Sequence, residues 1–189
     1  MKSILKMAQI INRPGSVVVI ATDTVYGLVA RAKDPQAVDR LYKLKNREDK
    51  PGTLIARSIE QLVELGFKRK YLVSVEQFWP GPVSVIIPCA NQALDYLKLG
   101  RPDIALRIPN DQKLLGLLEL TGPMITSSAN LPNQPPANTI SQAKAYFDNK
   151  VDAYFNGGDL AGRQPSTIIR VVDDAVEVIR QGSVNIENS

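Results

Sequence analysis

The feature that most constrains the fold is an unbroken apolar run from Ser16 to Ala21, in which residues 17–20 are all valine or isoleucine. Such a run predicts a strand that is buried on both faces of a sheet. It leads directly into a polar cluster, residues 22–27 (TDTVYG). A polar cluster at the end of a buried strand is a common place for a binding site in an α/β sheet. A turn in which Asp23 and the threonines bond to backbone groups explains the pattern equally well.

Helix-like and strand-like segments alternate along the rest of the chain. Helices are predicted over residues 2–12, 35–44, 58–65, 111–120 and 139–147. Strands are predicted over 16–21, 53–56, 83–88, 104–108, 124–128 and 151–155, with a closing hairpin over 166–172 and 175–179. Residues 91–100 are expected to form a surface excursion and 131–136 a loop. Without repeats or a long linker, this order predicts an α/β single domain with a mixed sheet over residues 1–182 and a frayed tail over 183–189.

The composition excludes several kinds of chemistry. The 189 residues contain no histidine, which removes Ser-His-Asp and Cys-His triads and histidine zinc sites. Cys89 is the single cysteine and is expected to be a buried, inert residue in a reducing cytosol. No apolar run of about 18 residues suggests a membrane span, and the N-terminus lacks the features of a signal peptide. We therefore expect a cytoplasmic protein without a protein-bound metal.

The positive charge is concentrated in one part of the chain. The net charge is +4, yet residues 31–70 contain eleven basic and six acidic residues. Lys45, Arg47 and Lys50 lie at the end of a predicted helix, where cations suit the helix dipole. The same cations could neutralise phosphate, and the hydroxyl and amide groups of Ser128 and Asn130 could orient what lies beside it. The pattern permits an ATP-using enzyme without a Walker or Rossmann motif, and it equally permits a basic RNA-binding module.

Seven segments, taken together and in order, resemble the threonylcarbamoyl-AMP synthases of the YrdC/Sua5/TsaC family. They are residues 22–28 (TDTVYGL), 45–51 (KNREDKP), 78–82 (FWPGP), 105–109 (ALRIP), 127–130 (SSAN), 166–169 (STII) and 180–182 (RQG). Each is weak alone, but seven in the family's order form a specific signal. The resemblance implies a YrdC-like catalytic domain with a twisted, open mixed sheet and flanking helices.

The resemblance also implies a reaction. L-threonine and bicarbonate would form a carbamate that attacks the α-phosphate of ATP, giving threonylcarbamoyl-AMP and pyrophosphate, with Mg²⁺ bound to the nucleotide. Proteins of the t6A pathway would then transfer the threonylcarbamoyl group to tRNA. The family fold also has a positively charged face that resembles a binder of double-stranded RNA.

Matching positions in the family imply the site residues. Catalytic roles fall to Lys45, Arg47 and Ser128. The nucleotide would be bound by Lys45, Arg47, Lys50, Ser128, Asn130 and Arg180. Threonine would be bound by Thr24, Tyr26, Arg107 and Ser166. No residue is assigned to a metal.

The chain departs from the family in two places. Residues 131–135 read LPNQP where the family usually has Leu-Ser-Gly-x-Pro, and Ala21 stands where a proline is frequent. The chain stops soon after residue 182, which resembles the short TsaC type.

Two other interpretations of the function stay open: a non-catalytic double-stranded RNA or tRNA binder, and a carbamoyl-adenylate enzyme like the related domain of hydrogenase maturation proteins.

Overall fold

A single nine-stranded mixed sheet runs through the molecule. The computed structural model describes residues 2–46, 50–173 and 175–187. The strands occur along the sheet in the order β7-β1-β2-β6-β3-β5-β4-β8-β9. Their bounds are β1 Val18–Ala21, β2 Tyr26–Arg31, β3 Thr53–Ile55, β4 Val83–Pro88, β5 Asp103–Arg107, β6 Met124–Ser128, β7 Ala153–Phe155, β8 Thr167–Val172 and β9 Ala175–Arg180. The pairs β1–β7, β3–β5 and β4–β8 are parallel, and the other five pairs are antiparallel. The predicted mixed sheet is thus confirmed.

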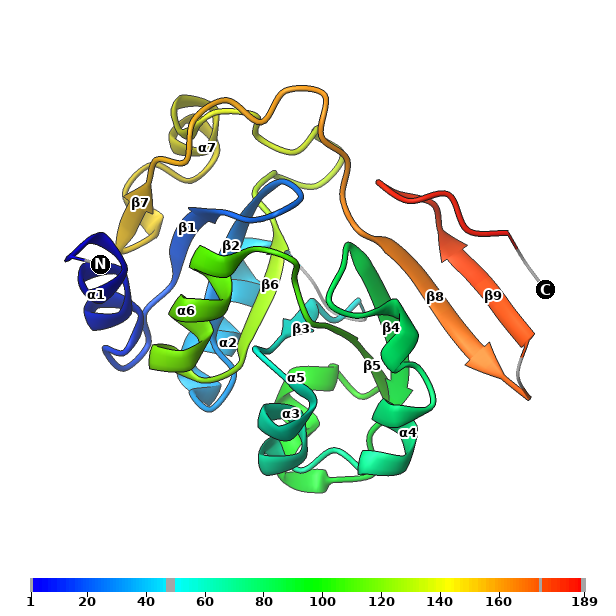
Figure 1. Cartoon of the computed structure of the whole chain (residues 1–189). Coiled ribbons are helices and arrows are strands. Elements are labelled where there is room, and N and C mark those ends of the chain that lie inside the picture. The colour runs from blue at the N-terminus through cyan, green and yellow to red at the C-terminus, as the bar shows by residue number, and fades with distance from the viewer. Residues whose placement is uncertain (1, 47–49, 174, 188–189) are drawn as a thin grey trace.

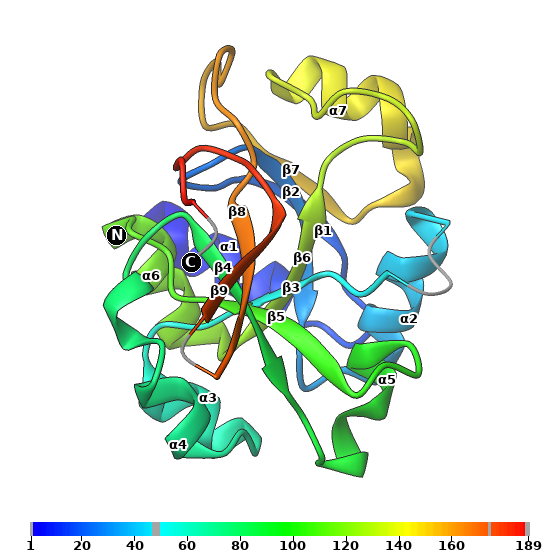
Figure 2. The ribbon, with the colours of Figure 1, turned by 90° about the vertical axis from the view of Figure 1, so that its right-hand side faces the viewer.

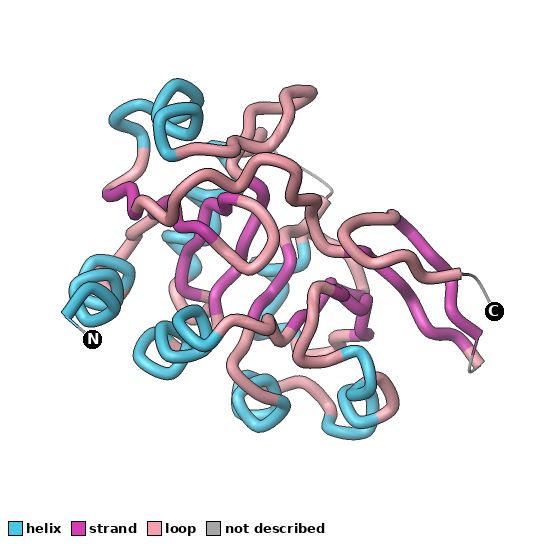
Figure 3. The backbone as a smooth tube through the Cα atoms, turned by 45° about the horizontal axis from the view of Figure 1, so that its top comes forward, coloured by secondary structure: helices cyan, strands magenta, loops and turns pink. Residues whose placement is uncertain are grey.

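Helices flank most of this sheet, whereas its β8–β9 end lies at the edge of the molecule with no helix of the described residues beside it (Figure 3). They are α1 Lys2–Ile11, α2 Pro35–Leu44, α3 Ile59–Leu65, α4 Arg69–Val73, α5 Asp95–Lys98, α6 Gln112–Thr121 and α7 Ile140–Phe147. Short 3-10 turns, η1 Glu76–Phe78, η2 Gln92–Leu94 and η3 Asp148–Lys150, connect several of them. Figure 1 shows α1 and α6 on the side of the sheet nearer the viewer, with α2 behind it.

The first strand has apolar neighbours on both of its faces, as the valine and isoleucine run predicts. Val18 and Ile20 pack in one cluster with residues of α1 and α6. Val17 and Val19 pack in the larger cluster, which includes residues of α2, α3, α4, α5 and α7. All four side chains are at most 1% exposed. Because β1 is packed on both faces, residues 22–25, which connect it to β2, are held at a fixed place at the end of these two strands.

The start of α2 is set by a capping side chain. Asp34 Oδ1 accepts from the Ala37 backbone N–H at 3.0 Å, and Asp34 Oδ2 accepts from the N–H of Gly15 at 2.8 Å. Pro35 fills the first turn, where its missing N–H costs nothing. The helix then ends at Leu44, so that Lys45 occupies the C-cap position. The predicted helix is confirmed, and it carries Lys45 to the edge of the candidate site.

The structure corrects several sequence-based expectations. Strand β2 was missed because its residues are buried on both faces, so they show no polar alternation. Helix α4, which was not predicted, begins within the basic residues 68–70, whose side chains are exposed. The segment 91–100 does more than cross the surface, since α5 buries Leu97 and Lys98.

The chain end was expected to fray from residue 183, yet it folds back on β8. Thr167 Oγ1 donates to the carbonyl of Val184 at 2.5 Å and accepts from the N–H of Gly182 at 3.0 Å. The N–H of Ser183 also donates to the carbonyl of Pro165. This end of the chain lies beside the β8–β9 hairpin, which faces the viewer in Figure 2.

Candidate active site

A central cavity forms where six segments that are separate in sequence meet on one face of the sheet. The register places Gly27 of β2 opposite Ser128 of β6, and Thr53 of β3 opposite both Thr126 and Ala105. Side chains two residues apart share a face, so Arg107 of β5 projects with them. The cavity measures about 90 Å³. Its lining comprises Thr22, Thr24, Val25, Gly27, Pro51, Gly52, Thr53, Arg107, Thr126, Ser127, Ser128, Pro165, Ser166, Ile168 and Arg180.

This lining brings together five of the residues predicted for the site: Thr24, Arg107, Ser128, Ser166 and Arg180. Sequence reasoning did not assign Gly27, Thr53 or Thr126. Gly27 had a usable signal, since glycine inside a strand marks a close approach to the backbone. A Cβ added there would lie 2.8 Å from Thr126 Oγ1. The missing side chain therefore keeps part of the cavity floor open.

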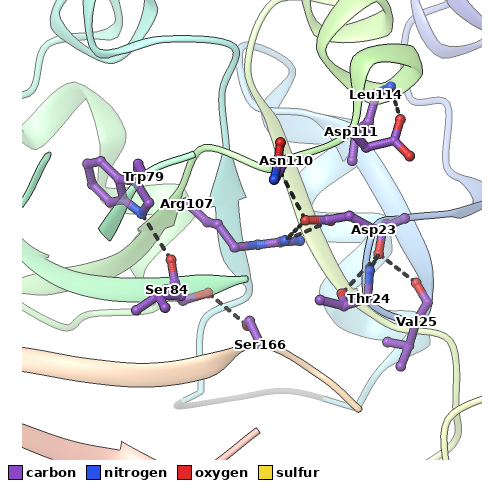
Figure 4. Close-up of polar contacts among 12 residues, drawn as sticks. Asp23, Thr24, Val25, Trp79, Ser84, Arg107, Asn110, Asp111, Leu114 and Ser166 are labelled. Atoms are coloured by element: carbon purple, nitrogen blue, oxygen red, sulfur yellow. Dashed lines mark hydrogen bonds and ion pairs between the residues drawn. The ribbon is translucent and has the colours of Figure 1, made fainter. Parts of the chain in front are cut away.

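A buried ion pair forms one wall of the site (Figure 4). Arg107 Nη1 lies 2.7 Å from Asp23 Oδ1 and 2.8 Å from Asp23 Oδ2. The backbone N–H of Asn110 also donates to Asp23 Oδ2 at 3.2 Å. The Arg107 side chain is 3% exposed, and its Nε is buried without a hydrogen-bond partner among the described residues. A buried donor without a partner is rare in proteins, so this guanidinium has capacity for a further acceptor.

The threonine cluster both forms a turn and lines the cavity. Thr22 Oγ1 donates to the carbonyl of Val25 at 2.7 Å and accepts from the N–H of Thr24 at 3.2 Å. The hydroxyls of Thr22 and Thr24 lie 3.0 Å apart. The two interpretations left open by the sequence are therefore compatible, because the turn presents Thr24 to the cavity.

Lys45 joins the cationic segment to the loop after β6. Its side chain is buried, and Nζ donates to the carbonyl of Ser128 at 2.8 Å, to Asn130 Oδ1 at 2.9 Å and to the Asn130 carbonyl. Ser128 Oγ donates to the same Asn130 Oδ1 at 2.6 Å. The sequence predicts that Lys45 contacts phosphate. In this structure its ammonium group bonds to the loop, and it thereby orders Ser128 and Asn130.

The loop that departs from the family pattern is held by Asn130. Asn130 Nδ2 donates to the carbonyls of Leu131 at 3.0 Å and Gln134 at 2.8 Å. Asn133, which stands at the family's usual glycine position, has a φ of +62°. Asparagine adopts this left-handed conformation more readily than most residues. Asn133 therefore adopts a backbone conformation that a glycine at this position would also allow.

The opposite wall comes from the segment before β8. Ser84 Oγ and Ser166 Oγ lie 2.8 Å apart, and both side chains are buried. Arg180 Nη2 donates to the Ser166 carbonyl at 2.6 Å. A Cβ on Gly182 would lie 2.2 Å from the carbonyl oxygen of Pro165, so only glycine permits this close approach.

Besides Lys45 and Asn130, three more predicted residues are not among the described lining residues: Tyr26, Lys50 and Arg47. Tyr26 is fully buried, and its hydroxyl accepts from the N–H of Gly157 at 2.9 Å and donates to the Gly158 carbonyl at 2.8 Å. It therefore anchors the loop after β7 and is not among the lining residues. Lys50 is exposed beside Pro51, and Arg47 lies outside the described residues.

No cluster of three or more metal-binding side chains occurs within residues 2–46, 50–173 and 175–187. Over the same ranges, the helices are too short and too polar to cross a membrane.

The sequence model of the Sua5/YciO/YrdC family, described as "Telomere recombination", matches residues 10–182. The chain belongs to this family. The resemblance carried by the seven sequence segments is thus confirmed.

Similar proteins include a threonylcarbamoyl-AMP synthase of Pseudomonas fluorescens, 34% identical over 161 residues, which cover 84% of this chain and 86% of the relative. A Bacillus subtilis protein of the same name is 30% identical over 188 residues; the match covers 97% of this chain and 54% of the relative. Among solved structures, P. abyssi Sua5 complexed with L-threonine matches with a TM-score of 0.84 at 30% identity, covering 96% of this chain and 54% of that one.

Proposed function

We propose that the chain is a threonylcarbamoyl-AMP synthase, which uses L-threonine, bicarbonate and ATP and releases pyrophosphate. The observation that carries the proposal is the buried Arg107 guanidinium with its unpartnered Nε in a small hydroxyl-lined cavity. Relatives that share most of their length with this chain carry the name of this enzyme.

The cavity suits the amino acid. A volume of about 90 Å³ is well below the range of about 300–1,000 Å³ typical of drug-sized ligands, so the cavity holds a small molecule. In this proposal Arg107 binds the threonine carboxylate, because guanidinium recognises carboxylate with directed, charge-assisted hydrogen bonds. The hydroxyls of Thr24 and Ser166 lie on the same lining and would bind the polar side chain of the substrate.

The nucleotide would lie at the mouth of the cavity, since the interior is too small for it. Ser128 and Arg180 lie on the lining, and Asn130 stands beside Ser128. We propose that Arg180, Lys50 and Arg47 neutralise the triphosphate, and that Ser128 and Asn130 form hydrogen bonds to it. Lys45 would act mainly by ordering Ser128 and Asn130, and it contacts phosphate only if it exchanges one loop acceptor for a phosphate oxygen. Such positioning and charge neutralisation supply most of the catalysis in transfer at phosphorus.

The proposed chemistry has two steps. The threonine amino group, as the free amine, forms a C–N bond with the carbon of bicarbonate, and water leaves to give the carbamate. A carbamate oxygen then forms a P–O bond with the α-phosphorus of ATP while the bond to the bridging oxygen breaks and pyrophosphate leaves. Arg107 would hold the carboxylate, which fixes the carbamate relative to the phosphorus.

Magnesium, in this proposal, arrives with the triphosphate as part of the substrate. The described residues offer carbonyl, hydroxyl and cationic groups at the site and no acidic cluster that would hold the ion independently. We further propose that the chain acts in the cytoplasm, where the free thiol of Cys89 is stable, and that its product passes to t6A-pathway proteins acting on tRNA.

The alternative, a non-catalytic RNA binder, is not favoured. An RNA duplex is bound through cations on the protein surface, whereas the Arg107 guanidinium is buried inside a cavity of small-molecule size.

Pyrophosphate release from ATP tests the proposal. Release should require both threonine and bicarbonate, and Arg107→Ala should abolish the threonine-dependent part. Arg57→Ala, which breaks an exposed ion pair with Glu119, is the control and should keep activity. Release that ignores threonine would refute the substrate assignment.

A further inference from the structure

We propose that Asp23 is a positioning residue for the amino-acid site. It fixes one nitrogen of Arg107 and leaves a single edge of the guanidinium, Nε with Nη2, to receive one carboxylate. The inference rests on the proposed function. It extends that function by assigning a role to the Asp23 carboxylate.

The geometry of the ion pair distinguishes the edges of the guanidinium. Both Asp23 oxygens approach the same nitrogen, Nη1, at 2.7 and 2.8 Å. A carboxylate that bound in the usual forked manner would take two nitrogens, one for each oxygen. In the part of the chain that the structure describes, no hydrogen bond joins Nη2 or Nε. These two nitrogens form the side-on fork of the guanidinium, and it remains complete.

Asp23 contacts Arg107 without itself lining the central cavity. Arg107 lines the central cavity, whereas Asp23 does not. Asp23 instead borders an adjacent open cavity of about 530 Å³, which it shares with Thr24, Arg163, Gln164 and the returning chain end. The Asn110 N–H holds Asp23 Oδ2 from a third direction, as Figure 4 shows. Asp23 is thus itself fixed, and it reaches the substrate only through Arg107.

The charges of Asp23 and Arg107 predict how removal of the ion pair would change threonine binding on the one hand and turnover on the other. Asp23 compensates the buried charge of Arg107, and it also repels a second carboxylate. Removing its charge strengthens the attraction of Arg107 for threonine but leaves the guanidinium without a fixed orientation. The stronger attraction and the lost orientation change threonine affinity in opposite directions. Neither of them raises kcat, because a carbamate displaced by about 1 Å reacts up to about a hundredfold more slowly.

The test is the kinetics of Asp23→Asn with threonine as the varied substrate. We expect kcat to fall about tenfold to a hundredfold, while the threonine KM stays within about threefold of the wild-type value and the ATP KM is unchanged. Threonine affinity measured by calorimetry without ATP should likewise change by less than about threefold. Asp23→Glu retains the charge with a longer reach, so it should recover part of the lost kcat.

The matched control is Asp152→Asn. Asp152 also pairs with an arginine, Arg40, and accepts a backbone N–H, that of Val17 at 2.8 Å, but it is not among the residues lining the central cavity. This variant should keep wild-type kinetics. If Asp23→Asn does not fold, as thermal unfolding would reveal, Asp23→Glu alone carries the test, with a reduced kcat expected at a nearly unchanged threonine KM.

Either of two results would overturn the inference. An unchanged kcat in the folded Asp23 variants would show that Arg107 needs no positioning. A threonine KM raised tenfold or more at constant kcat would make Asp23 a direct ligand instead. Failure of the proposed function is distinguishable, because the wild-type protein itself would then release no pyrophosphate in response to threonine.

Discussion

Replacement of Lys45 by methionine separates two possible roles of this residue, ordering the loop after β6 and contacting phosphate. Methionine keeps the apolar stem of the side chain and removes only the ammonium group. In the structure that group serves three acceptors on Ser128 and Asn130. If Lys45 orders this loop, the substitution should weaken both folding and catalysis. If it serves only as a phosphate contact, folding should not change.

The expected loss of folding stability depends on which acceptors keep another hydrogen-bond donor after the substitution. The Ser128 carbonyl still accepts from the N–H of Asn130 at 3.0 Å, and Asn130 Oδ1 still accepts from Ser128 Oγ. Among the acceptors in the described residues 128–130, the Asn130 carbonyl is the one that loses its assigned donor. One unsatisfied group costs about 1–3 kcal/mol, so the melting temperature should fall by about 2–12 °C for a domain of this size.

The assay pairs thermal unfolding with pyrophosphate release. Lys45→Met should lose at least about tenfold in kcat, because Ser128 and Asn130 lose their fixed positions beside the nucleotide. Lys43→Met is the matched control, since Lys43 is 77% exposed and its ion pair with Asp39 is worth about 0.5 kcal/mol at most. An unchanged melting temperature together with a raised ATP KM would refute the role of Lys45 in ordering the loop.

Three further predictions concern single side chains. Gly27→Ala places a methyl group 2.8 Å from Thr126 Oγ1 and should raise the threonine KM at least about tenfold, whereas Gly116→Ala, whose Cβ meets open space, should not; equal KM values would contradict the cavity assignment. Ser84→Ala removes the partner of Ser166 and should lower kcat/KM for threonine about fivefold, or about 1 kcal/mol, in steady-state assays; no change would show that this bond is dispensable. Burial, and then the nearby Asp34 carboxylate, raise the pKa of Tyr96, whose hydroxyl donates to the Ala32 carbonyl. The raised pKa means that the fold favours the neutral phenol, so this contribution is complete below about pH 10 and is lost as the pH rises through the folded-state pKa. The melting-temperature difference between wild type and Tyr96→Phe should therefore shrink above about pH 10, and a constant difference would contradict this assignment.

Local sequence signals predicted the elements that depend on local physics. The Val17–Ile20 run became a strand buried on both faces, and Asp34 with Pro35 began a helix where capping chemistry requires one. Strand β2 was missed for a physical reason. Its residues lie in the interior of the sheet and are buried on both faces. They therefore lack the alternation of apolar and polar residues that marks a strand with one exposed face.

The pairings within the site could not be read from the sequence. Asp23 and Arg107 are 84 positions apart, and Lys45 lies 83 positions from Ser128 and 85 from Asn130. Charge and position identify these residues as polar and clustered but do not say which groups they contact. The family resemblance supplied the list of site residues. The structure showed that Arg107 has a fixed counter-ion and that Lys45, which was predicted to contact phosphate, bonds to Ser128 and Asn130.

The most direct test of the central proposal is to follow carbon from labelled bicarbonate in a reaction with ATP and threonine. We expect a product that contains the labelled carbon, threonine and AMP in equal amounts, formed together with one pyrophosphate. The product should disappear when threonine is omitted and when Arg107 is replaced by alanine. A labelled product that lacks threonine, or pyrophosphate released without incorporation of the label, would contradict the account.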